Sequence, residues 1–382
     1  MTRAAFHVTA MRRALELAAR GRGFVEPNPQ VGAVVIRDDE IVGEGWHERF
    51  GGPHAEVMAL RAAGAKARGA TLCVTLEPCC HHGKTPPCTD AIRAAGIARV
   101  IVAATDPFPE VAGRGIETLR AAGIDVETGL LAAEAERLTA PFRTVVTQGR
   151  PWVVAKWAMS LDGRLTTSPG QDRWISSTES RGIVHDLRSR VDAIAVGSGT
   201  VVADDPLLTA RPEDESAAGP RRPLRIVFDG WARLPLSSNL VRTARHVPVL
   251  VAVGPQAPGD RVAALEAAGC EIWRCDAADT ADRTAALLAE LGRRQVTNLL
   301  VEGGPTLLAG MFAADQVDEV WAFVAPLILG GGTTGGPAPL SDMPRLVVED
   351  VSFPGGDILI RGTIGNRGLT SPACRGSHSA SG

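Results

Sequence analysis

The chain lacks the features that mark several large classes of protein. Its 382 residues carry a formal net charge of −3 at pH 7, so there is no positive excess to attract a polyanion. No segment approaches the apolar length of a membrane-spanning helix, and the amphipathic, arginine-containing start has no apolar stretch of secretory type. We therefore expect no nucleic-acid partner and no membrane partner, and a free small molecule as the ligand.

Lysine is scarce, because three lysines stand against thirty-seven arginines. The composition thus favours arginine wherever either cation would serve. An ammonium group is a compact point charge that can titrate, which a guanidinium group does not do in proteins. Two of the three lysines, Lys84 and Lys156, lie inside the motifs described below. Their position favours a chemical role over chance placement.

The cysteines do not suit a disulfide framework. There are seven, an odd number, and several are clustered in one short segment. This usage is typical of thiolate chemistry in a reducing compartment. We expect a cytoplasmic protein.

Two short segments together have the composition of a catalytic zinc site. His54 is followed by Glu56, and Cys79 and Cys88 lie in a later segment rich in Pro, Gly and His. A catalytic zinc ion takes three protein ligands in a tetrahedron and keeps the fourth position for water. His54, Cys79 and Cys88 supply the three, and Glu56 is placed to move protons beside the open position. The pattern is that of zinc nucleobase deaminases.

A closed structural zinc site is the competing interpretation. Four further residues could act as ligands: Cys73, Cys80, His81 and His82. Three of these are close sequence neighbours of Cys79, and consecutive residues rarely point at one metal ion. A structural site would also leave Glu56 without a task, so we favour the catalytic site.

The length predicts two domains, and apolar runs alternate with Ala- and Leu-rich helical stretches throughout, as in α/β proteins. The expected boundary lies near residues 148–151. His54 and Cys88 are expected at helix starts, where the helix dipole favours a thiolate or an anionic neighbour. The expected helices are 1–19, 54–63, 88–95, 177–188, 260–268 and 280–291. The expected strands are 31–37, 41–46, 71–76, 99–104, 152–158, 192–197, 224–228, 249–253, 298–301, 317–324 and 357–360.

These motifs, read together, resemble one family. The residues that carry the resemblance are Asn28 to Gly32, His54 to Glu56, Leu76 to Cys88, Lys156 to Arg164, Val196 to Thr200, Asp204 to Pro206 and Glu302 to Thr306. The long spacing between the two cysteines, with Gly-Lys-Thr-Pro-Pro inside it, differs from the short Cys-x-x-Cys of cytidine-type deaminases. Over residues 1–363 the chain closely resembles the bifunctional deaminase/reductase of riboflavin biosynthesis.

The resemblance implies two folds and two reactions. A cytidine-deaminase-like three-layer domain over residues 1–148 would be followed by a dihydrofolate-reductase-like α/β domain over 151–363 and a disordered tail over 364–382. The first domain would use Zn²⁺ to hydrolyse an amino group from a diaminopyrimidine ribosyl phosphate. The second would use NADPH to reduce the ribosyl group to ribityl. A homo-oligomer, dimer or tetramer, is expected from the resemblance alone.

The resemblance also implies residue roles. In the deaminase it implies Asn28 and His47 as pyrimidine and ribose contacts, Lys84 as phosphate anchor, and Glu56 as catalytic residue. In the reductase it implies Lys156 as catalytic residue, with substrate contacts from Asp172, Arg188, Leu208, Arg211 and Glu302. The implied cofactor contacts are Ala158, Trp174, Thr200, Asp204, Gly304, Pro305 and Thr306. Lys156, Asp162 and Glu302 are all candidates for the proton donor of the reduction.

The chain departs from the family pattern at two places. Asp172 stands where the family usually has a small hydroxyl residue near the substrate phosphate, which a carboxylate would repel, and Cys80 stands where Ser is common. Three classes of function are therefore open: the bifunctional enzyme, a deaminase with a second domain that only binds or scaffolds, and a structural zinc protein. A tRNA-editing deaminase is disfavoured by the acidic net charge.

Overall fold

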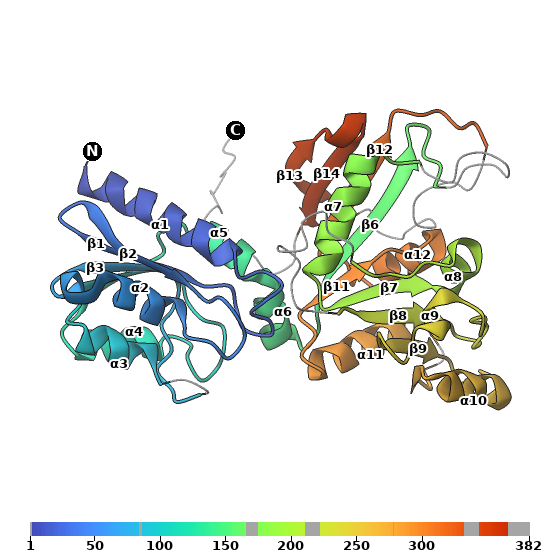
Figure 1. Cartoon of the computed structure of the whole chain (residues 1–382), viewed down its shortest axis with the longest axis horizontal. Coiled ribbons are helices and arrows are strands. Elements are labelled where there is room, and N and C mark those ends of the chain that lie inside the picture. The colour runs from blue at the N-terminus through green and yellow to red at the C-terminus, as the bar shows by residue number, and fades with distance from the viewer. Residues whose placement is uncertain are drawn as a thin grey trace, which may run out of the picture.

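Two separate β-sheets divide the molecule into two lobes (Figure 1). The computed structural model describes residues 2–83, 86–165, 175–210, 222–277, 279–331 and 344–365. We call the part up to Gln148 the first lobe and the part from Trp152 the second lobe. Within these described ranges, no helix has both the length and the apolar character needed to cross a membrane.

The first lobe is built on a five-stranded sheet of order β2-β1-β3-β4-β5. β1 pairs antiparallel with β2 and β3, and β3, β4 and β5 are parallel. Its elements are α1 (Arg3–Ala19), β1 (Gly32–Arg37), β2 (Glu40–Trp46), α2 (Ala55–Ala63), the 3-10 helix η1 (Gly64–Ala67), β3 (Thr71–Leu76), α3 (Cys88–Ala94), β4 (Arg99–Ala104), α4 (Arg114–Ala121), β5 (Asp125–Thr128), α5 (Ala132–Leu138) and α6 (Ala140–Gln148).

Helices cover both faces of this sheet, which gives three layers. Alternate residues of the strands face opposite sides. Val35 and Val74 pack with α2, α3 and α4 on one face, whereas Val34 and Ile101 pack with α1 and α5 on the other. Because both faces are buried, β3 and β4 are mostly apolar and do not alternate between apolar and polar residues.

Two glycines allow helices to approach the sheet of the first lobe closely. A Cβ at Gly32, the first residue of β1, would lie 2.0 Å from the Ala14 carbonyl oxygen of α1. A Cβ at Gly45 of β2 would lie 2.4 Å from the backbone nitrogen of Ala59 in α2. Only glycine fits at these contacts, so the Gly of the Asn28–Gly32 motif is explained by the packing of α1.

The second lobe is built on a nine-stranded sheet of order β10-β9-β8-β7-β11-β6-β12-β14-β13. The strands from β10 to β12 are parallel, and β14 and β13 are antiparallel additions. Its elements are β6 (Trp152–Ser160), α7 (Thr178–Ser189), β7 (Ala193–Gly197), α8 (Ser198–Asp204), β8 (Leu224–Phe228), α9 (Asn239–Arg242), β9 (Val249–Val253), α10 (Gly259–Ala268), β10 (Glu271–Arg274), α11 (Thr280–Arg293), β11 (Asn298–Val301), α12 (Pro305–Ala313), β12 (Glu319–Ala325), β13 (Leu346–Ser352), the 3-10 helix η2 (Pro354–Gly356) and β14 (Ile358–Ile364).

The topology of this sheet places a binding edge at the carboxyl ends of its central strands. β6 is followed by β7, β8, β9 and β10 on one side, and the chain then returns to insert β11 between β6 and β7. Ligands of open α/β sheets bind outside the carboxyl ends of strands where the strand order reverses. The loops after β6, β7 and β11 therefore form the expected ligand edge of the second lobe.

Charged and aromatic side chains join the two lobes. Arg137 of α5 donates to Glu349 of β13 at 2.9 Å, lies 3.2 Å from Glu319 of β12, and stacks on the Trp152 ring at 5.4 Å. Glu319 is buried and also accepts from the indole N–H of Trp152 at 3.0 Å. The lobes are therefore in direct contact through desolvated groups.

The end of the chain differs slightly from the predicted boundary. β14 extends through Ile364, the first residue of the predicted tail, because Ile364 pairs with Leu346 of β13 and donates its backbone N–H to the Asp318 carbonyl at 3.0 Å. The rest of the predicted tail beyond Gly365 lies outside the described residues.

Candidate active sites

Two thiols and an imidazole converge beside the carboxyl end of β3. His54 caps the start of α2, Cys79 follows β3, and Cys88 is the first residue of α3. The Nδ1 atom of His54 lies 3.2 Å from the Cys88 sulfur and 3.6 Å from the Cys79 sulfur. The backbone N–H of Cys88 donates to the Cys79 sulfur at 3.3 Å. All three donor atoms lie within 4.8 Å of one another.

The spacing of these atoms fits a tetrahedral zinc ion. Zn–S and Zn–N bonds at the usual lengths separate a sulfur from a nitrogen by about 3.6 Å. The measured separations of 3.2 and 3.6 Å match this scale without rearrangement of the backbone. Cys88 donates a hydrogen bond to the sulfur of Cys79, which lowers the pKa of Cys79 to about 4 and raises that of Cys88. A thiolate is the form that binds zinc.

A buried carboxylate lies beside this cluster. Glu56, in the first turn of α2, is 3% exposed and contacts Cys88. Burial disfavours its charged form and raises the pKa of Glu56 to about 7. A carboxyl group with such a pKa can both accept and donate a proton near neutral pH. The cluster thus offers three side chains that could hold a metal ion and a separate carboxyl group beside them.

The predicted pyrimidine and ribose contacts, Asn28 and His47, lie beside this cluster. The side-chain amide of Asn28 is 3.1 Å from Nε2 of His47, and Nδ1 of His47 is 3.0 Å from the Pro53 carbonyl. This arrangement fits a neutral His47 that donates from Nδ1 and accepts at Nε2. Burial lowers the pKa of His47, which agrees with the neutral form. Its ring meets that of His54 edge-on at 5.4 Å.

A second polar cluster lies at the ligand edge of the second lobe. Arg188 of α7 donates from Nε and Nη2 to the two oxygens of Glu302, at 2.6 and 2.8 Å. The Lys156 ammonium lies 3.8 Å from Glu302 and 5.7 Å from the Phe323 ring centre. Although burial opposes its charge, Arg188 holds the pKa of Glu302 below its usual value. Burial lowers the pKa of Lys156.

Two strand-to-helix turns meet beside this cluster. The backbone N–H of Gly304, which caps α12, donates to the hydroxyl of Thr200 in α8 at 3.2 Å. Both helices begin at the carboxyl ends of neighbouring strands, β11 and β7. Backbone N–H groups at such turns can hold a phosphate group. Thr200, Gly304, Pro305 and Thr306 therefore lie together, beside Lys156 and Glu302.

Comparisons with known proteins match both lobes. The model for the cytidine and deoxycytidylate deaminase zinc-binding region matches residues 5–104, and that for the RibD C-terminal domain matches residues 151–353. The riboflavin biosynthesis protein RibD of Escherichia coli is 41% identical over 375 residues, which cover 92% of this chain and 97% of that protein. The RibD protein of Aquifex aeolicus is 43% identical over 326 residues, covering 85% and 88%.

The chain belongs to the RibD family. Solved structures agree with the assignment. Acinetobacter baumannii RibD superposes with a TM-score of 0.81 at 35% identity, over 94% of this chain and 99% of that one. A Thermotoga maritima deaminase/reductase superposes with a TM-score of 0.80 at 36% identity, over 94% and 99%. This chain therefore joins a zinc-dependent deaminase to an NADPH-dependent reductase of riboflavin biosynthesis.

The RibD assignment confirms the fold class and the function that the sequence resemblance implied. The first lobe is cytidine-deaminase-like and the second is the α/β reductase. Of the remaining predicted contacts, Ala158 lies on β6, Asp204 ends α8, and Leu208 is 2% exposed with a positive φ of 51°. The predicted contacts Lys84, Asp172, Trp174 and Arg211 lie outside the described residues.

Sequence reasoning gave no role to Glu77, which the structure places under the metal-ligand loop. Glu77 is 3% exposed, and its two oxygens accept four backbone N–H groups. The donors are Asp106 at 3.2 Å, Gly113 at 2.9 Å, Gly115 at 2.9 Å and Ile116 at 3.2 Å. Glu77 stands two residues before Cys79, so it fixes the path of the ligand loop. A carboxylate directly after an apolar strand was the signal that could have revealed it.

Proposed function

We propose that the first lobe deaminates a 2,5-diamino-6-ribosylamino-4(3H)-pyrimidinone 5′-phosphate, and that the second lobe reduces the ribosyl group of the product. The similar Thermotoga maritima protein is a diaminohydroxyphosphoribosylaminopyrimidine deaminase and 5-amino-6-(5-phosphoribosylamino)uracil reductase. The observation that carries the proposal is the convergence of His54, Cys79, Cys88 and Glu56 beside Asn28 and His47.

For the deamination, we assign the metal to His54, Cys79 and Cys88. Zinc bound by these residues supplies a Lewis acid that makes water nucleophilic near neutral pH. Glu56 takes a proton from the attacking water and passes protons to the ring nitrogen and then to the leaving ammonia. Asn28 and His47 orient the pyrimidine and the ribose. Lys84, from the same ligand loop, is assigned to the substrate phosphate.

For the reduction, we assign the role of proton donor to Lys156. NADPH supplies the hydride that the ribosyl carbon accepts, and the opening sugar ring needs a proton on its oxygen. The Lys156 side chain is 17% exposed at the ligand edge, with Glu302 beside it to preserve its charge. Asp162 is a poorer donor, because its hydrogen bond from Ser160 lowers its pKa to about 2.

The remaining predicted contacts form the binding surfaces of the second lobe. We assign cofactor binding to Ala158, Trp174, Thr200, Asp204, Gly304, Pro305 and Thr306. We assign substrate binding to Asp172, Arg188, Leu208, Arg211 and Glu302. Because Arg188 already uses Nε and Nη2 on Glu302, it would meet phosphate through its other N–H groups.

We further propose domain limits of 1–148 and 151–363, a homo-oligomeric assembly and a cytoplasmic location. The assembly is supported by the edge strand β13, where Val347, Val348 and Val351 are about half exposed and the following Phe353 is 70% exposed. An exposed apolar edge strand favours pairing with another chain. Light scattering of the V348K variant tests this, since a smaller assembly than that of the parent protein is expected and an unchanged mass would contradict the proposed contact.

The experiment for the two activities follows ammonia release and NADPH consumption separately on the full chain, with zinc measured on the same sample. The parent protein is expected to give both signals with about one zinc ion per chain. E56Q should keep its zinc and lose ammonia release by about 100-fold or more. K156M should keep ammonia release and lose NADPH consumption.

Two results would contradict the proposal. Ammonia release without any NADPH consumption by the parent protein would show a second lobe that only binds or scaffolds. Bound zinc with neither signal, and no difference between E56Q and the parent, would indicate a structural zinc site.

A further inference from the structure

Asp162 has no part in either proposed reaction, yet its carboxylate joins two separate turns of the second lobe. It lies in the turn that follows β6 and meets the segment that follows β12. The Ser160 hydroxyl donates to Oδ1 of Asp162 at 2.6 Å. The backbone N–H of Leu329 donates to the same oxygen at 3.1 Å, and that of Gly330 donates to Oδ2 at 2.8 Å. We call these four residues the carboxylate clamp.

The turn that carries Asp162 is closed on itself through Ser160, which is 0% exposed. The backbone N–H of Ser160 donates to the Arg164 carbonyl at 2.9 Å, and its hydroxyl accepts the backbone N–H of Arg164 at 2.9 Å. Gly163 has a φ of 75°, which favours glycine, and its N–H donates to the Ser160 carbonyl at 2.9 Å. Asp162 is therefore presented from a fixed backbone.

Packing in the core contributes little to holding the two turns together. Leu161 is 62% exposed and Ile328 is 78% exposed, so their apolar side chains remain in water. The backbone N–H of Leu161 donates to the Leu327 carbonyl at 2.8 Å. Hydrogen bonds to an ionised carboxylate are stronger than neutral ones. The clamp is therefore the main support of this contact.

The clamp closes the free end of a two-stranded extension above the ligand edge. β11 ends at Val301, whereas β6 continues to Ser160. Along this extension, from Lys156 to Ser160, β6 pairs with β12. Lys156 stands at its base, 3.8 Å from Glu302, where β11 still lies alongside. The far end of the extension lies beyond that support and depends on the clamp.

The extension carries side chains that the proposed reduction uses. Ala158, a proposed cofactor contact, pairs with Phe323 of β12, two residues before the last pair of the two strands. Ends of elements with few buried contacts open at low free energy. Loss of the clamp should thus displace Ala158 more than Lys156, which is nearer the base. Cofactor binding should respond more strongly than proton transfer.

We infer that Asp162 is a positioning residue of the reductase, which clamps the end of β12 to the end of β6 and so holds Ala158 against the cofactor. It acts through the two strands and does not touch the reacting atoms. The inference rests on the proposed function of the second lobe, with Ala158 at the cofactor. It gives a role to a carboxylate that is a poor proton donor.

The test compares D162N with the parent protein as full-length chains. Asparagine has the same shape, but its amide accepts on one side only, so a backbone N–H of the clamp loses its partner. The KM for NADPH should rise by about tenfold, because charged hydrogen bonds are lost. The kcat of reduction and the rate of ammonia release should stay close to those of the parent. Hydrogen exchange at Leu329 and Gly330 should become faster.

Two further variants sharpen the test. S160A removes the hydroxyl that orients the carboxylate, so it should also raise the KM for NADPH. In the S160A/D162N double variant the rise should be smaller than the product of the two single effects, because both act on one clamp. D279N is the matched control. Asp279 is a carboxylate that accepts the backbone N–H groups of Ala281 and Asp282 at the start of α11, and its change should leave the KM for NADPH unaltered.

Four results separate this inference from the proposed function. Faster exchange at Leu329 and Gly330 with an unchanged KM for NADPH would show a clamp that serves stability alone. Unchanged exchange would show that Asp162 does not hold these residues. A fall in kcat with an unchanged KM would place Asp162 in the chemical step. Each of these three would overturn the inference and leave the reductase assignment intact.

The fourth result concerns the reduction itself. If the parent protein consumed no NADPH, the proposed reduction would fail. Calorimetric binding of NADPH that was weakened in D162N and retained in D279N would still support the positioning role of the clamp.

Discussion

At the scale of single residues, the ion pair of Glu302 and Arg188 influences the protonation state of Lys156. Two cations share one buried carboxylate, so Glu302 compensates a charge that burial alone would disfavour. Lys156 lies within β6, and Glu302 directly follows β11, where Val301 pairs with Ala155. The pair is therefore formed by the register of β6 and β11 and not by local sequence. A neutral side chain of the same shape at position 302 isolates this effect.

The E302Q variant is expected to lose NADPH consumption by about tenfold or more while ammonia release is unchanged. Without the carboxylate, the pKa of Lys156 falls further, since Glu302 is the group that raises it. Lys156 must be protonated to act as an acid, so the alkaline limb of the reduction rate should move to lower pH. Rate profiles against pH for both activities check this, with the exposed Glu266→Gln as control. An alkaline limb that did not move would contradict the assignment.

At the scale of elements, the ligand loop is stiffened from below by Glu77. Four backbone N–H groups from the β4–α4 region converge on its carboxylate, and a Cβ at Gly115 would lie 2.1 Å from the Pro78 carbonyl. The loop that carries Cys79 is thus pressed against the start of α4. Groups that orient metal ligands commonly affect metal affinity by about 10- to 100-fold.

The E77Q variant is expected to bind zinc about 10- to 100-fold more weakly, because an amide can accept at only one of the two positions. The free energy of unfolding should fall by about 2 kcal/mol. Competition with a chelator gives the metal affinity, and denaturant titration gives the stability. E110Q, a change at an exposed neighbour, serves as the comparison. If E77Q bound zinc as tightly as the parent protein, Glu77 would not be needed to orient the ligand loop.

The packing of α1 on β1 gives a second prediction at this scale. G32A should lower the free energy of unfolding by about 3 kcal/mol, because its Cβ meets the backbone of Ala14 and not a flexible side chain. G310A is the matched control. Gly310 lies inside α12 with no atom within 4 Å of the added Cβ, so its stability should stay level or rise. Equal stability of the two variants, measured by thermal unfolding, would show that α1 can shift.

Burial explains which of these elements could be predicted from the sequence and which could not. The strands 71–76, 99–104, 224–228, 249–253 and 298–301 were predicted with the bounds that the structure has, since they are short, mostly apolar segments that are buried along most of their length. β13 was missed because it is an edge strand with exposed valines and no buried run. The sequence already pointed to His54, Cys79 and Cys88 through their chemistry, and the structure brings the three donor atoms within 4.8 Å of one another. The pairing of Arg188 with Glu302 could not, because 114 positions separate them.

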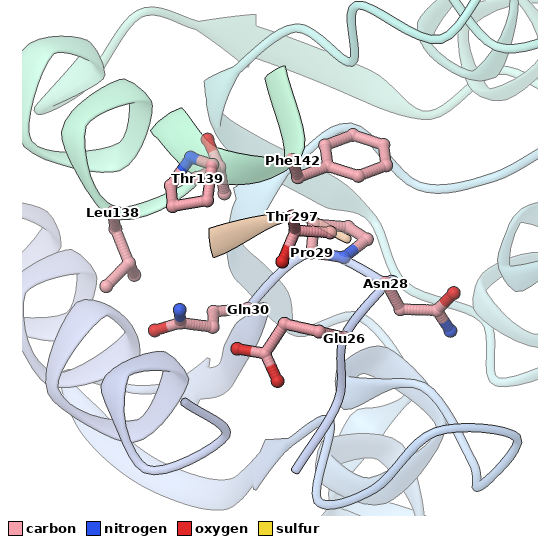
Figure 2. Close-up of a pocket in the computed structure, with 9 residues that line it drawn as sticks. Glu26, Asn28, Pro29, Gln30, Leu138, Thr139, Phe142 and Thr297 are labelled. Atoms are coloured by element: carbon pink, nitrogen blue, oxygen red, sulfur yellow. The ribbon is translucent and has the colours of Figure 1, made fainter. Parts of the chain in front are cut away.

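At the scale of the whole molecule, the loop that carries Asn28 lies at the junction of the lobes. Figure 2 shows a pocket whose lining includes Glu26, Asn28, Gln30 and Phe142 from the first lobe and Thr297 from the second. Thr297 directly precedes β11, the strand that leads to Glu302. Nearby, a Cβ at Gly23 would lie 3.1 Å from the Cα atom of Arg190.

The R137M variant should uncouple the lobes. Arg137 links α5 to Glu319 and Glu349, and its loss removes the ion pair of the buried Glu319 and leaves Arg22 as a remaining positive charge acting on it, at a cost of about 2 kcal/mol. Calorimetry of the parent protein is expected to show one coupled transition and that of R137M two, the lower one for the less stable lobe. R12M, at an exposed position of α1, is the control. A single transition at the parent temperature in R137M would place the coupling elsewhere.

The position of Thr297 against the Asn28 loop bears on how such a chain could be divided. If the chain were cut between Gln148 and Trp152, the amino-terminal part would keep the proposed zinc ligands, but the pocket beside the loop of Asn28, the proposed pyrimidine contact, would lose Thr297 from its lining. The two lobes therefore share one pocket, although their proposed reactions are unrelated. A separate protein made of the first lobe alone would need a partner chain, or different residues of its own, to replace Thr297 in the lining of this pocket.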